Sequence, residues 1–199
     1  LSFSDVIELA GITPIPPYLG RETETIDQNR YQTVYSKIKG SVAAPTAGLH
    51  FTDNLVEKLI KKGNSITELT LHVGAGTFKP VQTETINDHE MHTEFFSVST
   101  SSLKELINKH GNIISVGTTT LRTLESLYWL GVKIHKGLEE KNNLLRLNQW
   151  DAYKLDGTLN YAEAIEVLRH HLEKRNLQEL YAYTQIMIAP GYQVKSANA

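Results

Sequence analysis

Residues 112–131 read NIISVGTTTLRTLESLYWLG, and this stretch carries the pattern from which we predict the fold. Its opening, 112–117, is a continuous apolar run typical of a strand buried on both faces of a sheet. A helix is expected over 119–130, and Gly131 is expected to end it. A strand, a polar loop and a helix closed by glycine make one unit of an α/β fold.

The same order recurs in the preceding part of the chain, where β-branched runs alternate with helical patterns. We predict strands over 40–44, 65–73 and 93–99, and helices over 52–62 and 101–110 that end at Gly63 and Gly111. Repeated strand–helix units favour parallel pairing, because a crossover helix returns the chain to the end of the sheet where the previous strand began. The predicted fold is therefore α/β, either barrel-like or an open, mostly parallel sheet with alternating helices.

The regular alternation stops after Gly131. We interpret 133–180 as a surface insertion that contains one helix, with Asn160 and Glu163 as its capping box and an end near Arg175. The whole chain, 1–199, is then one α/β unit with this insertion. Because the first residue is Leu1 rather than methionine, we expect N-terminal and C-terminal parts to be missing.

Composition excludes several classes of chemistry. The 199 residues include no cysteine, which rules out disulfides, thiolate nucleophiles and cysteine-ligated metals. The formal net charge of −2 supplies no global attraction for nucleic acid, so such a partner would need a local basic patch. No apolar run is long enough to cross a bilayer, and no signal peptide opens the chain.

Three loops at predicted strand ends are rich in small and polar residues, which is where ligands bind in parallel α/β sheets. The first, PTAGLHFT at 45–52, offers Thr46, Gly48 and His50 before a helix that Thr52 can cap. Helix N-termini present unpaired N–H groups and partial positive charge to carboxylates, phosphates or hydroxyl-rich ligands. The alternative for this loop is plain turn chemistry with an N-cap.

The second loop, LHVGAGTFKP at 71–80, follows a predicted strand and contains His72, Gly74, Gly76 and Thr77. Its two glycines allow the backbone to approach a ligand closely. The third glycine and the following helix of a dinucleotide fingerprint are lacking, so we reject that interpretation. A bulge or a tight turn is the alternative.

The third loop, VGTTTLRTLES at 116–126, places Thr118 and Thr119 at the start of the predicted helix and Arg122 one turn further. Arg122 could hold a carboxylate or a phosphate. Because Glu125 follows three residues later, a salt bridge on the helix surface is the alternative.

Between the second and third loops lies NDHEMHTEFF at 87–96, in which His92 and Glu94 would share one face of a strand. A histidine paired with a carboxylate suits general acid–base catalysis. Metal binding through His89 and His92 is the alternative, but the spacing shows no third ligand. We therefore predict no metal site.

These motifs together resemble one family, the S-adenosylmethionine:tRNA ribosyltransferase-isomerases of queuosine biosynthesis. The resemblance rests on GSVAAPTAGLHFT, LHVGAGTFKPV, HEMHTEFF and VGTTTLRTLES in that order, with YQTVY at 31–35 and APGY at 189–192. It covers roughly residues 14–127 and again from about Thr184, so 128–183 inherits nothing from it. The family's inserted β-barrel domain and its Asn-Phe-His motif are absent from the sequence, which makes the chain resemble the central part of such an enzyme.

The resemblance implies a reaction, a barrel-like fold and a set of roles. The ribosyl part of S-adenosylmethionine would pass to the aminomethyl group of a 7-deazaguanine base in the tRNA anticodon and rearrange, with release of adenine and methionine. S-adenosylmethionine would be a cosubstrate, no metal or redox cofactor would be needed, and the enzyme would be a cytoplasmic monomer away from membranes. The expected catalytic residues are His50, His72, His92 and Glu94, and the expected cosubstrate-binding residues are Thr46, Gly48, Gly74, Gly76, Thr77, Thr118, Thr119 and Arg122.

Two other classes remain open. A metal-dependent hydrolase on an α/β barrel would use the histidines of the same loops. A non-enzymatic RNA-binding module would carry basic stripes interleaved with exposed aromatic residues, a pattern that the sequence does not show.

Overall fold

The computed structural model describes most of the chain. The described residues are 15–38, 41–74, 76, 83–109, 112–138 and 144–197. Thr77 and Gly111, to which the sequence assigned a ligand contact and a helix end, lie outside them.

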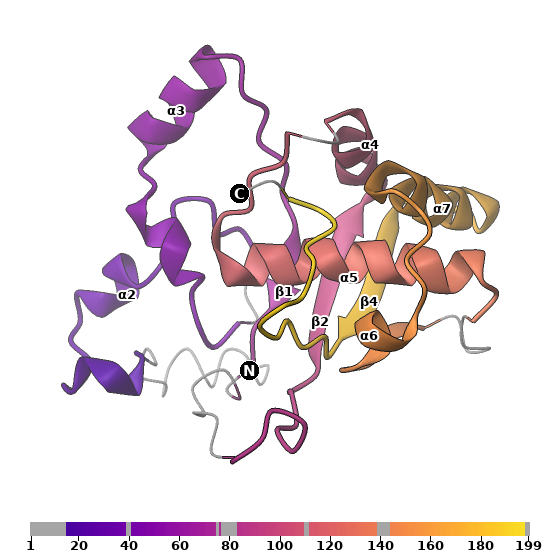
Figure 1. Cartoon of the computed structure of the whole chain (residues 1–199). Coiled ribbons are helices and arrows are strands. Elements are labelled where there is room, and N and C mark those ends of the chain that lie inside the picture. Colours follow the sequence, from indigo (N-terminus) through magenta and orange to yellow (C-terminus); the bar gives the residue numbers. More distant parts are fainter. Residues whose placement is uncertain are drawn as a thin grey trace, which may run out of the picture.

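A four-stranded sheet in the order β1-β2-β4-β3 forms the centre of the molecule (Figure 1). Strand β2 (Glu94–Ser99) runs antiparallel to β1 (Thr70–His72) and to β4 (Glu179–Thr184). Only β3 (Leu145–Leu147) pairs in parallel, with β4. The sheet is therefore mixed and mostly antiparallel, with β1 and β3 at its two open edges.

The prediction of a barrel-like or mostly parallel arrangement is therefore wrong. The run 112–117, expected to be a strand buried on both faces, does not join the sheet, and Ile114 in it is 75% exposed. Without that strand no parallel crossover forms next to β2, and its neighbours are the antiparallel β1 and β4. The predicted strand over 65–73 shortens to β1, and 41–44 contacts Val73 through one backbone hydrogen bond, from Val42 N, without becoming a strand.

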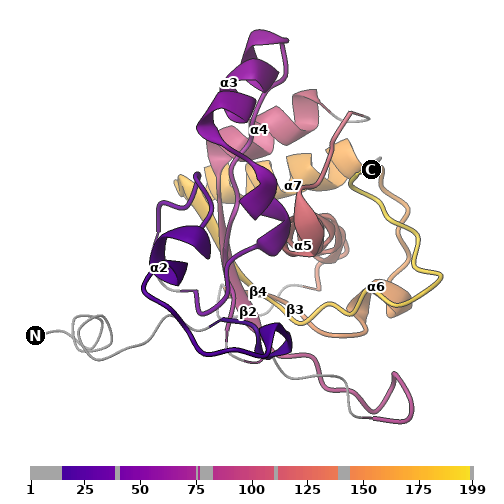
Figure 2. The same ribbon diagram turned by 90° about the vertical axis from the view of Figure 1, so that its left-hand side faces the viewer.

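Three helices, α4 (Thr100–Asn108), α5 (Gly117–His135) and α7 (Tyr161–Lys174), build the core with one face of the sheet. In Figure 1, α5 crosses in front of the strands, and the orthogonal view places α5 and α7 on the same side of them (Figure 2). Among the described residues, no helix is both long enough and apolar enough to cross a bilayer.

The remaining helices are short. Helices α2 (Asp27–Arg30) and α3 (Asp53–Lys61) lie beyond the β1 side of the sheet (Figure 1). The 3₁₀ turns η1 (Pro17–Leu19) and η2 (Thr46–His50) belong to the same N-terminal part, and α6 (Asp151–Lys154) follows β3. Thr52 caps α3 as predicted, because its Oγ1 accepts a hydrogen bond from Leu55 N at 3.2 Å.

Gly131 does not end α5, which continues to His135. A Cβ atom at position 131 would lie 2.2 Å from the carbonyl oxygen of Ala164 on α7, a distance that no side chain tolerates. The glycine is therefore needed where the backbones of two helices cross closely, and the prediction of a helix stop was wrong.

Parts of 133–180 lie in the core rather than on the surface, where the whole stretch was expected. Ala164, Ile165 and Leu168 of α7 are fully buried, as is Leu147 of β3. The capping box of α7 is confirmed, with Asn160 and Glu163 bonded reciprocally. The division of the chain into one unit with an insertion stays a prediction.

A buried carboxylate anchors the C-terminal segment to α5. Glu125 is fully buried and accepts hydrogen bonds from Lys195 N at 3.0 Å and Ser196 N at 2.8 Å, as well as from the hydroxyls of Ser196 and Tyr192. Trp129 Nε1 donates to the Tyr192 hydroxyl at 2.6 Å. Burial and the neighbouring Glu125 both raise the pKa of Tyr192, which keeps its hydroxyl protonated as a donor.

We predict that Glu125→Ala lowers the free energy of unfolding by about 3 kcal/mol, because it leaves several buried donors without an acceptor. Urea denaturation measures this loss, and hydrogen exchange at the Ser196 amide should accelerate. Glu57→Ala is the matched control, because Glu57 is exposed and faces Lys61 at 3.6 Å, a pair worth less than about 0.5 kcal/mol. Equal losses in the two variants would contradict the anchoring role.

The carboxylate of Asp27 allows a prediction of how stability depends on pH. Asp27 accepts two hydrogen bonds from Arg21, both at 2.7 Å, and one from Glu24 N at 2.8 Å. The Arg21 guanidinium, and then the Glu24 N–H, lower the pKa of Asp27 to about 2. As the pH falls, the unfolded chain binds a proton at Asp27 before the folded chain does. The stabilisation is therefore complete above the usual carboxyl pKa and disappears as the pH falls towards 2.

Urea unfolding of the wild type and of Asp27→Asn at several pH values tests this. The wild type should be the more stable at pH 7, and its advantage should shrink between pH 4 and pH 2. An advantage that stays constant over that interval would show that Asp27 titrates normally.

Candidate active site

The candidate site is built around Glu94, the first residue of β2. Alternation along the strand puts Glu94 on the same face as Phe96 and Val98, which are buried beneath the helices. Its side chain is only 3% exposed. A carboxylate at such a position must be paired and hydrogen-bonded, because burying an isolated charge costs many kcal/mol.

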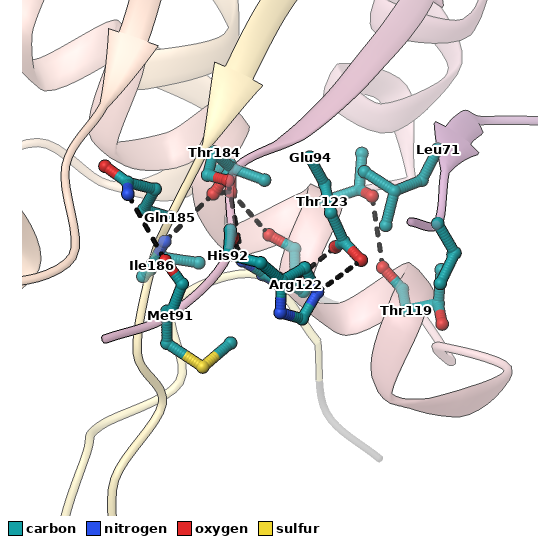
Figure 3. A network of polar contacts seen from close by, with 12 residues as sticks. Leu71, Met91, His92, Glu94, Thr119, Arg122, Thr123, Thr184, Gln185 and Ile186 are labelled. Atoms are coloured by element: carbon teal, nitrogen blue, oxygen red, sulfur yellow. Dashed lines mark hydrogen bonds and ion pairs between the residues drawn. The ribbon is translucent and has the colours of Figure 1, made fainter. Parts of the chain in front are cut away.

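Two side chains supply the pairing, one from the segment just before β2 and one from α5 (Figure 3). His92 Nε2 lies 2.8 Å from Glu94 Oε1, and Arg122 Nη1 on α5 donates to Glu94 Oε2 at 2.5 Å. The predicted pairing of His92 with Glu94 is confirmed. The alternative of an Arg122–Glu125 surface salt bridge is wrong, because Arg122 binds Glu94 while Glu125 binds the C-terminal segment.

Arg122 also ties the segment just before β2 to the end of β4. Its Nη2 donates to the carbonyl of His92 at 3.1 Å and to that of Thr184 at 3.4 Å. Burial lowers the pKa of Arg122 and the Glu94 carboxylate raises it in return, so the guanidinium keeps its charge. Its Nε is buried and has no hydrogen-bond partner within the described part of the chain.

This cluster, His92–Glu94–Arg122, has the composition of an acid–base device. A carboxylate bound to an imidazole fixes the orientation of the ring and stabilises its protonated form. The His92 side chain is 29% exposed, so a ligand can reach it, whereas Glu94 is enclosed. The backbone of Gly76 lies close to the His92 side chain. A Cβ at position 76 would lie 3.1 Å from His92 Cβ and from the ring atom Cγ.

A hydroxyl pair behind the cluster was not anticipated from the sequence. Ser126 Oγ on α5 donates to Thr184 Oγ1 at 2.7 Å and also contacts the Arg122 carbonyl, and both side chains are fully buried. Thr184 Oγ1 in turn accepts from Ile186 N at 3.1 Å. These contacts fix the end of β4 against α5, and neither hydroxyl residue stands out in the sequence around it.

The first and third loops meet at the start of α5. Gly117, with φ of 85°, opens the helix, and a Cβ there would lie 3.1 Å from Ala47 Cβ in η2. Thr118 is exposed and Thr119 is half-buried in the first turn of α5. The loop that contains Thr46, Gly48 and His50 is thereby brought beside the helix N-terminus, and the role of these residues in a shared site stays a prediction.

The residues of this junction differ in how far they are exposed to solvent. Gly48 is buried because the Tyr35 hydroxyl packs against it, at 1.9 Å from where a Cβ would be. Thr46 and His50 are exposed at the two ends of η2. Gly74 is in open space, where a Cβ would touch nothing.

His72 lies on the other face of the sheet from Glu94. It pairs with Phe95 in register and stacks on that ring, with centroids 5.6 Å apart. The structure therefore separates His72 from the cluster with which the sequence grouped it, and its catalytic role stays a prediction.

The histidines do not converge as the hydrolase alternative requires. In the described ranges no group of three or more histidine, aspartate or glutamate side chains could hold a metal ion. The sheet is also open rather than the barrel of that alternative.

We predict that Arg122→Ala destabilises the protein by about 3–5 kcal/mol, because it leaves the Glu94 carboxylate buried without its cation. Urea denaturation of Arg122→Ala, Glu94→Gln and the double variant forms a thermodynamic cycle. The double variant should recover part of the loss, and purely additive losses would contradict the pairing.

Known proteins share long stretches of this sequence. Curated relatives named S-adenosylmethionine:tRNA ribosyltransferase-isomerase are 55% identical over 127 residues in Halothermothrix orenii, 51% over 125 residues in Legionella pneumophila strain Corby and 53% over 131 residues in Rickettsia bellii. These matches cover 61–63% of this chain and 37% of each relative, so the chain spans little more than a third of their length. No solved structure matches it.

A family model described as "Queuosine biosynthesis protein" matches residues 2–199. The match takes in β2, the start of α5 and η2, which carry the candidate site, together with nearly all the rest of the sequence. The chain belongs to the queuosine biosynthesis protein family.

Proposed function

We propose that this protein transfers and isomerises the ribosyl moiety of S-adenosylmethionine onto a 7-aminomethyl-7-deazaguanine base in tRNA, giving epoxyqueuosine-tRNA with release of adenine and methionine. Family membership and the names of the relatives support the reaction class. The observation that carries it in this chain is the His92–Glu94–Arg122 cluster beside the small-residue loops. We further propose that it acts in the cytoplasm as a monomer on the tRNA anticodon region.

His92 is the proposed proton-transfer group. The sulfonium of S-adenosylmethionine acidifies the neighbouring C–H bonds, and a positioned base is needed to take such a proton. Glu94 orients the imidazole through its 2.8 Å contact and stabilises the imidazolium that forms. Arg122 Nη1 donates to Glu94 Oε2, so the cation acts on the proton-transfer group through the carboxylate.

The junction of η2 with α5 is the proposed cosubstrate site. The first turn of α5, with Thr118 and Thr119, presents backbone N–H groups and the positive end of a 19-residue helix. These groups suit the carboxylate of the methionine moiety, and His50 and Thr46 line the exposed side of the same junction. The Nε of Arg122, which has no hydrogen-bond partner among the described residues, is a further donor for a polar group of the cosubstrate.

The test separates the two proposed regions with single substitutions. We predict that His92→Gln lowers turnover, followed as adenine release in a protein of the relatives' full length, by about 10²–10⁴-fold. Calorimetric titration with S-adenosylmethionine should show little change for His92→Gln, whereas His50→Ala should weaken binding. His170→Gln, at an exposed position on α7, is the matched control and should change neither.

Either result can fail separately. Turnover at the wild-type rate in His92→Gln would remove that residue from the chemistry. Unchanged binding in His50→Ala would place the cosubstrate elsewhere, and absence of S-adenosylmethionine binding in the full-length protein would overturn the proposed function.

A further inference from the structure

The face of the sheet opposite α5 carries a row of aromatic residues. Register aligns His72 of β1 with Phe95 of β2, Phe95 with Tyr183 of β4, and Tyr183 with Arg146 of β3. Tyr181 stands on the same face of β4, two residues before Tyr183. We call these five residues the aromatic face. They lie on the face of the sheet opposite α5, and this face is turned away from the viewer in Figure 1.

The rings touch one another in a continuous series. Phe95 stacks on Tyr181 with centroids 5.9 Å apart and an interplanar angle of 9°, and its centroid lies 5.3 Å from that of Tyr183. The Arg146 guanidinium lies over the Tyr183 ring, 5.2 Å from its centroid. Side chains that meet in this way are held in place before any ligand arrives, which lowers the entropic cost of binding.

The composition of this face differs from that of the helix-covered face, and Ser97, between Thr70 and Tyr181, is its one buried member. The side chains of the four strands that point to this face are aromatic, hydroxylic or charged, and none is aliphatic: Thr70, His72, Phe95, Ser97, Ser99, Arg146, Glu179, Tyr181 and Tyr183. The helix-covered face carries mainly aliphatic residues instead, such as Leu71, Val98, Leu145, Leu147 and Leu180. Tyr181 is 51% exposed.

We propose that the aromatic face binds the unpaired bases of a single RNA strand, which stack on Phe95, Tyr181 and Tyr183 while Arg146 contacts the sugar–phosphate backbone. Flat aromatic side chains with polar edges match the π-faces and polar edges of nucleobases, and stacking needs no particular base sequence. The Arg146 cation lies at the end of the row, where a strand crossing the sheet would bring a phosphate.

Charge decides between an RNA strand and other occupants. The only carboxylate among the strand residues that point to this face, Glu179, accepts a hydrogen bond from the Tyr181 hydroxyl at 2.7 Å. The row itself therefore holds one guanidinium and no acidic group, which suits an anionic partner, and the rings beside that cation favour one that carries planar bases. The inference deepens the proposed function and rests on it, because the substrate there is a tRNA whose anticodon loop presents unpaired bases.

Fluorescence anisotropy with the 199-residue chain tests the proposal. The probe is a fluorescein-labelled 12-nucleotide single-stranded RNA of mixed sequence, compared with the same strand annealed to its complement. The single strand should bind more tightly than the duplex, and Tyr181→Ala should weaken its binding about tenfold or more. Tyr181→Phe should bind as the wild type does, because stacking needs the ring and not the hydroxyl.

The matched control is Tyr18→Ala, which removes a tyrosine that is 78% exposed on η1, outside the sheet. It should leave binding unchanged, and circular dichroism should show that each variant is folded. Arg146→Ala should weaken binding and reduce its dependence on salt, because one phosphate contact is lost.

Several outcomes would overturn the proposal. These are absence of single-strand binding by the wild type, equal binding of the duplex, or equal effects of Tyr181→Ala and Tyr18→Ala. Sedimentation that shows a dimer dissociated by Tyr181→Ala would assign the face to a second copy of the chain. Loss of S-adenosylmethionine binding with RNA binding intact would instead count against the proposed function and not against this face.

Discussion

The burial of one carboxylate constrains the whole centre of this molecule. Glu94 sits under the helices at the start of β2, where its charge is tolerable only with a cation at hydrogen-bond distance. Arg122 meets that need from the second turn of α5, and its Nη2 donates to the carbonyls of His92, just before β2, and of Thr184, at the end of β4. The ion pair therefore sets the position of α5 relative to the sheet and, through the same carboxylate, the orientation of His92.

Strict alternation along β2 then gives the sheet two chemistries. Glu94 faces the helices, whereas the adjacent Phe95 faces the opposite side, so neighbouring residues of one strand belong to an acid–base cluster and to an aromatic row. A shift of one residue in the register would exchange them and bury the wrong side chains. The antiparallel pairing of β2 with β4 over six residues holds this register.

Local features were predictable from the sequence because they depend on neighbouring residues. The Thr52 cap, the Asn160–Glu163 capping box and the His92–Glu94 pair all follow from short spacings. The sheet topology was not predictable in this way, because an apolar run such as 112–117 does not reveal whether it will find a strand to pair with. The aromatic face was missed for a related reason: its residues come from four strands separated along the chain and become neighbours only in the sheet.

The close crossing at Gly131 has a mechanical consequence. The α5 backbone rests against the Ala164 carbonyl there, and Arg122 lies nine residues earlier on the same rigid rod, about 13.5 Å along its axis. A substitution that tilts α5 at this crossing would therefore also displace the Arg122 guanidinium, because both positions belong to the same helix. A methyl group added at a glycine far from any reacting atom would misalign the imidazole, so the demand for atomic precision in the site extends deep into the scaffold.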